Sequence, residues 1–403
     1  MPEPLEDTHL TEDSIETEVL DDGRTPEEAL QERAAVREEL ARMRTFVAGL
    51  SFDDIKQGHW FAKLLTFSLA KYVMQVDAEY FRRKYPHLPT DAIVEARIKL
   101  ASRYAGIEGG LNASAASGAV LATTVSGGAA SPLALPAGVT SFVLDLAYTT
   151  QIQLKLAYDI AVLYGVPLDL DDPEDLWRLI RIAFVVKSGE VGTSAAGKAV
   201  PAFLKPLVKK IFSGARLAAA KELPVIGRHL LQRNIVKFSL PVVNIPLSVA
   251  INTWMTRVAG DHARHVLREE ARIIEAAGRL VAKTTNHEAL LWVMWLVMQA
   301  NKHTSDQETC LLHHVARLAS ERSELDSTLD ALRAVVEVDS AVVLSLLNHA
   351  DPDAAVLHEA AVLSAAVNGR VKEDEMTWLK RVAEACGQEH DPAAVKTAAK
   401  TWH

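Results

Sequence analysis

A stretch of 36 residues without a charged side chain, 109–144, most limits how this 403-residue chain can fold. Along its first part, small residues recur at every fourth position: Gly110, Ser114, Gly118, Ala122, Ser126 and Ala130. This spacing lets two helices approach closely, as in membrane-helix dimers. Pro132 and Pro136 interrupt the stretch, which indicates a helical hairpin with a second limb starting near Ala137. Two hypotheses stay open: close packing of two helices through these small residues inside a helical core, or conditional insertion of the hairpin into a bilayer.

Helical signals dominate the rest of the sequence, and no run of alternating apolar and polar residues bounded by turns would build a sheet. We therefore expect an all-α fold. The pattern predicts a charged helix over 26–50, a helix that opens at Thr90 and ends near Gly106, and a hairpin limb over 137–164. A chain of 403 residues is long enough for two or three separate cores.

Charge is distributed unevenly along the chain, whose net charge is -9. Residues 1–28 hold eleven acids against one base, and we expect them to be a disordered tail. Residues 198–237, the basic segment, hold nine bases against one acid and favour an anionic partner. Lysines mixed with apolar residues indicate an interfacial amphipathic helix, although a core-packing helix with solvated lysines has the same pattern. The candidate membrane contacts are Lys198, Phe203, Lys205, Lys209, Lys210, Phe212 and Arg216.

The uncharged stretch and the segments that follow it resemble the EcsC family of bacterial proteins over about residues 55–280. The resemblance rests on an Asp-Asp-Pro-Glu run at 171–174 and on these positions: Pro136, Asp145, Gln153, Tyr164, Gly165, Pro241, Asn252 and Ala263. The family is named after a protein encoded beside an ABC transporter, and it has no agreed catalytic residues. The resemblance therefore implies accessory work linked to a membrane and no particular reaction; we expect a protein partner that the sequence does not identify, for which a transporter is one candidate.

An internal repeat marks the C-terminal part, where residues 301–316 align without a gap on residues 368–383. Each copy predicts a helix, a polar turn and a second helix, and Ser305 with Glu308 forms a capping box in the first copy. This pattern resembles the TerB-like, tellurite-resistance type of helical domain over about residues 285–388. In that pattern an Asp precedes a Glu by seven residues, but here Asn301 and Asn368 replace the Asp. Glu308 and Glu375 are therefore weak metal candidates, because hard cations prefer carboxylates.

Other chemical motifs are incomplete, and we expect no cofactor. Residues 192–199 nearly match a phosphate-binding loop, but Ala199 replaces the magnesium-binding Ser or Thr. The pairs His262 with His265 and His313 with His314 each offer too few ligands for a metal site. The two cysteines, Cys310 and Cys386, have no further cysteine to complete a zinc cluster. No hydrolase motif is present, and the acidic chain shows no motif for nucleic acid, which we do not expect as a partner.

These patterns predict an acidic tail and charged helix over 1–50, an EcsC-like domain over 51–283, a TerB-like domain over 284–392 and a tail over 393–403. Without a signal peptide or about 20 strongly apolar residues in a row, we expect a cytoplasmic, peripherally membrane-associated protein. The predicted function is accessory or stress-response work through lipid and protein contacts. An enzyme and a membrane-inserting effector stay as alternatives. A closed cavity lined by Asp145, Tyr158 and Asp159 would favour the enzyme.

Overall fold

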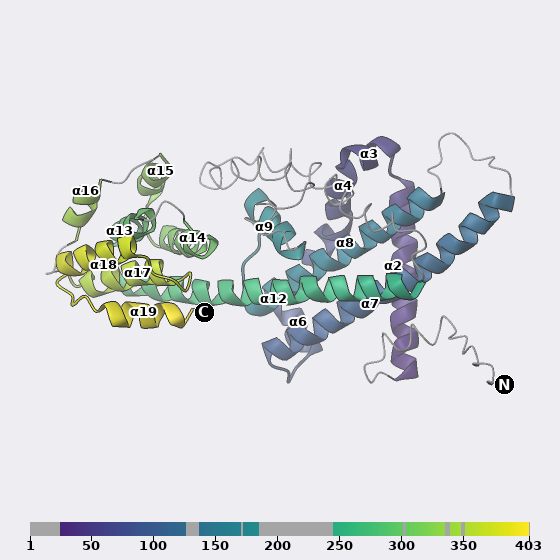
Figure 1. The fold of residues 1–403 in the computed structure, drawn as a ribbon, viewed down its shortest axis with the longest axis horizontal. Coiled ribbons are helices and arrows are strands. Elements are labelled where there is room, and N and C mark those ends of the chain that lie inside the picture. The colour runs from purple at the N-terminus through teal and green to yellow at the C-terminus, as the bar shows by residue number, and fades with distance from the viewer. Residues whose placement is uncertain are drawn as a thin grey trace, which may run out of the picture. The chain divides into compact units, whose positions relative to one another are not determined.

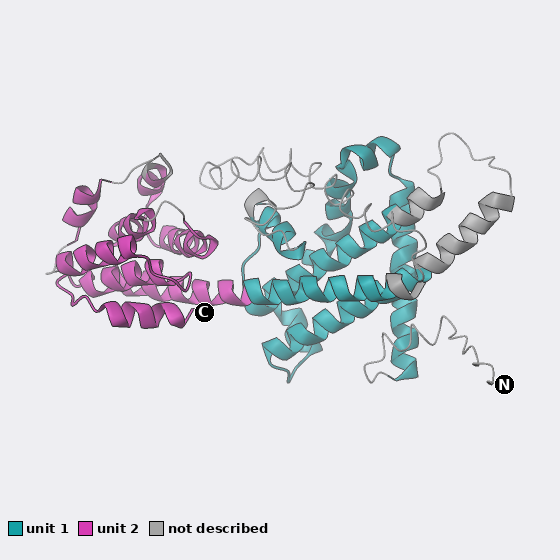
Figure 2. Ribbon diagram, viewed as in Figure 1, with its two compact units in different colours: residues 1–266 teal, residues 267–403 magenta. Residues whose placement is uncertain are grey.

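The computed structural model describes residues 25–125, 137–170, 172–184, 245–300, 304–334, 339–347 and 351–402. The described residues form helices and turns and contain no strand, which confirms the all-α prediction (Figure 1). None of the helices in these ranges is both long and apolar enough to cross a bilayer. The chain divides into two compact units, Met1–Val266 and Leu267–His403 (Figure 2).

The first unit is built around a pair of long helices. Its helices are α2 (Pro26–Ala48), α3 (Phe52–Gln57), α4 (His59–Ser68), α5 (Ala70–Val73), α6 (Ala78–Lys84), α7 (Thr90–Val125), α8 (Ala137–Tyr164), α9 (Pro173–Ala183) and the first part of α12 (Ile245–Lys283). Helices α7 and α8 pack against each other, and α2 packs on both (Figure 1). Trp60 and Phe61 of α4 complete the core and are fully buried.

Helix α2 belongs to the core of the first unit, although the sequence placed it with the N-terminal tail. A capping box between Thr25 and Glu28 starts the helix, and Glu32 and Glu39 form ion pairs with Arg103 of α7 and Lys155 of α8. Its buried residues lie three or four positions apart, so they form one stripe against α7 and α8: Val36, Leu40, Met43 and Val47. The predicted helix over 26–50 is therefore confirmed, but its assignment outside the first domain is wrong.

Two of the predicted helix ends were placed at a glycine, and the structure confirms only one of them. The limb predicted over 137–164 matches α8, and Gly165 follows it with φ of 69°, a left-handed conformation that glycine adopts readily. In contrast, α7 continues to Val125 and does not end near Gly106. Gly106 is buried within the helix and does not stop it, because a glycine inside a helical pattern is tolerated.

The second unit contains two helix-turn-helix pairs and further short helices. Its helices are the last turns of α12, α13 (His287–Gln299), α14 (Asp306–Ser320), α15 (Asp326–Ala334), α16 (Ser340–Ser345), α17 (Ala354–Ala366), α18 (Glu373–Ala385) and α19 (Pro392–Lys400). Helices α13 and α17 pack together at the centre, and nine of the 13 residues of α13 are buried. The pairs α13 with α14 and α17 with α18 correspond to the two copies of the repeat.

Two predicted domain boundaries need correction. The units divide within α12, between Val266 and Leu267, and not at 283/284. The sequence marks the end of α12 clearly, but the last turns of that helix already bond within the second unit, as in the 2.7 Å contact from Arg272 Nη2 to the Thr401 carbonyl. Residues 393–403 are not a simple tail, because α19 buries Val395 and Ala399 and packs on α17.

Candidate functional site

Two carboxyl groups, one completely buried and one half-buried, meet where the uncharged stretch begins and ends. Glu108 of α7 is the last charged residue before the stretch, and Asp145 of α8 is the first after it. Because α7 and α8 run antiparallel, the two residues meet. Asn252 of α12 joins them, since its Nδ2 donates to Glu108 Oε2 at 3.3 Å and to Asp145 Oδ1 at 2.9 Å. Three helices thus contribute one side chain each to a single polar cluster, the carboxyl pair site.

Burial determines the protonation of this pair. The pKa of Glu108 lies well above its usual value, first because the side chain is completely buried and then because the negative charge of Asp145 disfavours a second ionised group. Glu108 Oε1 meets no hydrogen-bond donor among the described residues, so an ionised Glu108 would leave a buried acceptor unsatisfied. A protonated Glu108 donates to Asp145 instead. Burial and the charge of Asp145 therefore both favour the protonated form of Glu108.

Further polar groups are buried near the carboxyl pair. Tyr148, one turn along α8 from Asp145, is fully buried, and its pKa is raised by burial, by Glu39 and by Glu108. The hydroxyls of Tyr148 and of Thr256, one turn along α12 from Asn252, have no hydrogen-bond partner in the described part of the chain. This end of the core is therefore unusually polar for a packed helical interface.

A second polar network fixes the opposite end of the helix pair. Arg97 of α7 binds Asp159 of α8 through two contacts, Nη2 to Oδ2 at 2.6 Å and Nε to Oδ2 at 2.9 Å. Tyr72 Oη donates to the other oxygen, Asp159 Oδ1, at 2.7 Å. Burial raises the pKa of Asp159, and Arg97 opposes that effect. Both carboxylate oxygens are satisfied, so this network acts as a structural clamp.

Helix α12 packs tightly against this helix pair. A Cβ placed on Gly260 would lie 2.9 Å from Ile98 Cγ1 of α7 and 3.0 Å from Leu156 Cδ2 of α8. Glycine is thus required for the close approach of the three helices. Arg264 Nη1 and Arg257 Nη2 each bind Glu95 on α7, at 2.7 Å and 3.0 Å. These contacts position α12 so that its Asn252 lies beside Glu108 and Asp145.

The structure does not bring Asp145, Tyr158 and Asp159 into one cluster. Asp145 and Asp159 are 14 residues apart on α8, which corresponds to roughly 21 Å along a helix. The Tyr158 hydroxyl donates to the backbone carbonyls of Val73 and Val76, at 3.4 and 3.3 Å. The residues proposed to line an enzyme cavity therefore belong to separate sites.

The positions that carry the EcsC resemblance have different environments. Asp145 and Asn252 meet in the carboxyl pair site, whereas Gln153 and Ala263 are buried elsewhere along α8 and α12. Tyr164 Oη donates to Asp91 Oδ1 at 2.7 Å.

The structure describes only some of the other candidate positions. Gly110 is buried in α7, and Ser114, Gly118 and Ala122 also lie within that helix. The remaining candidates lie outside the described residues: Ser126, Ala130, Pro136, Lys198, Phe203, Lys205, Lys209, Lys210, Phe212, Arg216 and Pro241.

In the second unit, the two weak metal candidates act as helix caps. Glu308 Oε2 accepts the backbone N–H of Ser305 at 2.9 Å, which confirms the predicted capping box, and Glu375 Oε2 accepts that of Lys372 at 2.8 Å. Asn368 Nδ2 donates to Glu308 Oε1, so the two copies of the repeat are linked through their turns. Burial raises the pKa of Glu308, and the charge of Glu375 adds to that effect.

Comparisons with known proteins give no match: the chain matches no protein-family model, no curated protein and no solved structure. The role of the carboxyl pair site therefore has to follow from its own chemistry. Sequence reasoning found Asp145 and Asn252 but missed Glu108. The available signal was its position as the last charged residue before the uncharged stretch.

Proposed function

We propose that this chain is a membrane-proximal accessory protein, which presents the uncharged stretch and the basic segment to an anionic lipid surface. One observation supports this proposal most. Glu108 and Asp145, which bound the uncharged stretch, meet as a pair to which Asn252 donates, and burial together with the charge of Asp145 raises the pKa of Glu108. The two residues that bound the 36 uncharged residues therefore lie side by side in the first unit.

The charge pattern supports an anionic surface. Each Lys or Arg close to an anionic leaflet contributes about 1 kcal/mol, so the nine bases of the basic segment are sufficient for reversible binding. Phe203 and Phe212 would add apolar contact at the interface. The acidic tail competes for the same bases within the chain, so it would limit binding until a membrane or partner displaces it.

The family resemblances support an accessory role in transport or envelope stress. The resemblance of the first unit to EcsC proteins implies work beside a membrane, and the resemblance of the second unit to TerB-like domains suits a compact helical module that binds a protein partner, for which a transporter is one candidate. We place the protein on the cytoplasmic side, peripherally bound to the membrane.

A membrane-inserting effector is the second candidate, and the protonation of Glu108 favours it. A neutral carboxylic acid costs far less than a carboxylate to bring near hydrocarbon. Because Glu108 already holds a proton in the folded state, the base of the uncharged stretch opposes insertion less than two ionised carboxylates would.

Co-sedimentation with vesicles tests the proposal. The wild type should bind anionic vesicles at low salt and bind neutral vesicles much less. The Lys205→Glu, Lys209→Glu, Lys210→Glu variant should lose most of this binding.

The matched control is Lys71→Glu, Lys380→Glu, Lys396→Glu, which changes the net charge equally at three exposed lysines. That control should bind more strongly than the test variant. Equal binding by the test variant and the wild type would contradict the role of the basic segment.

A further inference from the structure

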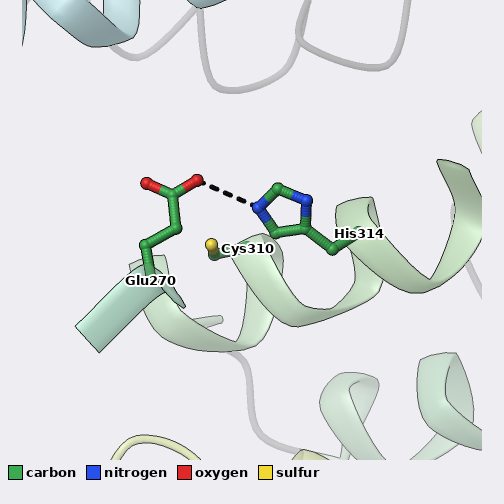
Figure 3. Close-up of side chains that lie close together, drawn as sticks. All are labelled: Glu270, Cys310 and His314. Atoms are coloured by element: carbon green, nitrogen blue, oxygen red, sulfur yellow. Dashed lines mark hydrogen bonds and ion pairs between the residues drawn. The ribbon is translucent and has the colours of Figure 1, made fainter. Parts of the chain in front are cut away.

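A second cluster of reactive side chains lies in the second unit, independent of the proposed function. Glu270 of α12 faces Cys310 and His314 of α14, and the sulfur of Cys310 lies beside the Glu270–His314 contact (Figure 3). His314 Nε2 lies 2.9 Å from Glu270 Oε1. One sulfur, one nitrogen and one oxygen from the three residues all lie within 4.8 Å of one another.

Local structure explains why these side chains converge. Cys310 and His314 are four residues apart on α14, so they lie on the same face of the helix, one turn apart. The capping box at Ser305 fixes where α14 begins, and buried Leu311 and Val315 fix which face of the helix points inward. Glu270 comes from a second helix, 44 residues away from His314 in the sequence.

The cluster is mostly buried. Glu270 is 5% exposed and His314 1% exposed, whereas Cys310 is half-buried. A divalent cation would bind the thiolate form of Cys310 and would neutralise its charge together with that of the Glu270 carboxylate. The half-buried cysteine gives the site one side that solvent can reach.

We propose that Glu270, Cys310 and His314 bind one divalent transition-metal ion, with Zn²⁺ as the preferred ion. Thiolate sulfur, imidazole nitrogen and carboxylate oxygen are the ligands that zinc uses in proteins, and three protein ligands leave a fourth position open. Zinc–ligand bonds of about 2.0–2.3 Å in tetrahedral geometry place ligand atoms roughly 3.3–3.8 Å apart. The cluster needs side-chain shifts of only about 1 Å to reach this geometry. The open position lies on the solvent side, where water or an external ligand completes the sphere.

Cobalt titration of the full-length chain tests the proposal. After removal of metal with a chelator, Co²⁺ should bind with a stoichiometry of one and give the absorption of thiolate-to-cobalt charge transfer. Zn²⁺ should displace it. Cys310→Ser should abolish the charge-transfer band, and His314→Gln and Glu270→Gln should each weaken Zn²⁺ affinity by at least about tenfold.

The matched controls change the same residue types elsewhere. Cys386→Ser removes the other cysteine of the chain and should bind Co²⁺ as the wild type does. The Glu308→Gln, Glu375→Gln variant should also bind normally, which separates this site from the capping turns. Circular dichroism of each variant checks that it is folded.

Alkylation of the wild type gives a readout that needs no variant. Zn²⁺ should slow modification of Cys310, measured by peptide mass spectrometry, and leave the modification of buried Cys386 unchanged. The proposal is overturned by an absence of saturable Co²⁺ or Zn²⁺ binding at micromolar concentrations. It is also overturned if Cys310→Ser binds Co²⁺ with the wild-type spectrum, or if Zn²⁺ leaves Cys310 alkylation unchanged.

Discussion

Replacement of Glu108 by glutamine should remove a specific pH dependence of stability. The folded protein keeps a proton on Glu108 at pH values where the unfolded chain, with a pKa near 4.5, releases it. A raised folded pKa contributes stability that is fully present below the unfolded pKa and is lost as pH rises through the folded pKa. The wild-type free energy of unfolding should therefore decrease as the pH rises from the unfolded to the folded pKa of Glu108.

The size of this effect follows from one proton. Each pH unit between the unfolded and folded pKa values of Glu108 lowers the free energy of unfolding by up to about 1.4 kcal/mol. Glutamine has nearly the same shape, stays neutral and can still donate to Asp145 and accept from Asn252. Relative to the wild type, Glu108→Gln should therefore gain up to about 1.4 kcal/mol in the free energy of unfolding for each pH unit crossed between these two pKa values.

Urea denaturation followed by circular dichroism over a pH series measures this difference. Burial also raises the pKa of Asp159, which adds a slope of the same sign, but this contribution cancels between wild type and variant. Glu38→Gln, at a side chain that is 76% exposed, is the control and should keep the wild-type slope. An identical slope in Glu108→Gln and wild type would refute the raised pKa of Glu108.

Four further substitutions test the packing. Gly260→Val should destabilise the first unit by about 1–3 kcal/mol through overpacking, whereas Gly278→Ala, where an added Cβ meets nothing within 4 Å, should stabilise α12 by about 0.5–1 kcal/mol. Arg97→Ala should cost about 3–5 kcal/mol, because it leaves Asp159 buried and unpaired, and adding Asp159→Asn should recover part of that loss. Val395→Asp should lower the melting temperature of the second unit, because α19 buries this residue. Thermal and urea denaturation check each substitution, and an unchanged transition would contradict the corresponding contact.

Local signals predicted those parts of the fold that depend on neighbouring residues. The limb over 137–164 ends at a glycine and the capping box at Ser305 lies within one turn, so the sequence alone was sufficient for both. The end predicted near Gly106 was wrong, because a glycine can end a helix or lie inside one, and only the neighbouring helices decide which. The tail predicted over 393–403 was wrong for a similar reason, since the burial of α19 depends on α17.

The two sites depend on contacts between distant residues, which the sequence does not specify. Asn252 is 144 residues from Glu108 and 107 from Asp145, and nothing in the linear pattern pairs them. The spacing of Cys310 and His314 was visible, but without Glu270 it gave only two ligands. The side chain that meets His314 is Glu270, from a distant part of the sequence, and not only the adjacent His313.

The dependence of vesicle binding on salt tests the central claim most directly. Screening shortens from about 10 Å at 0.1 M salt to about 3 Å at 1 M, so a peripheral, electrostatic contact must weaken over this range. The account predicts that the wild type sediments with anionic vesicles at low salt and is released at 1 M salt. An absence of binding at low salt would contradict membrane association, and binding that resists 1 M salt would replace the peripheral contact with an inserted hairpin.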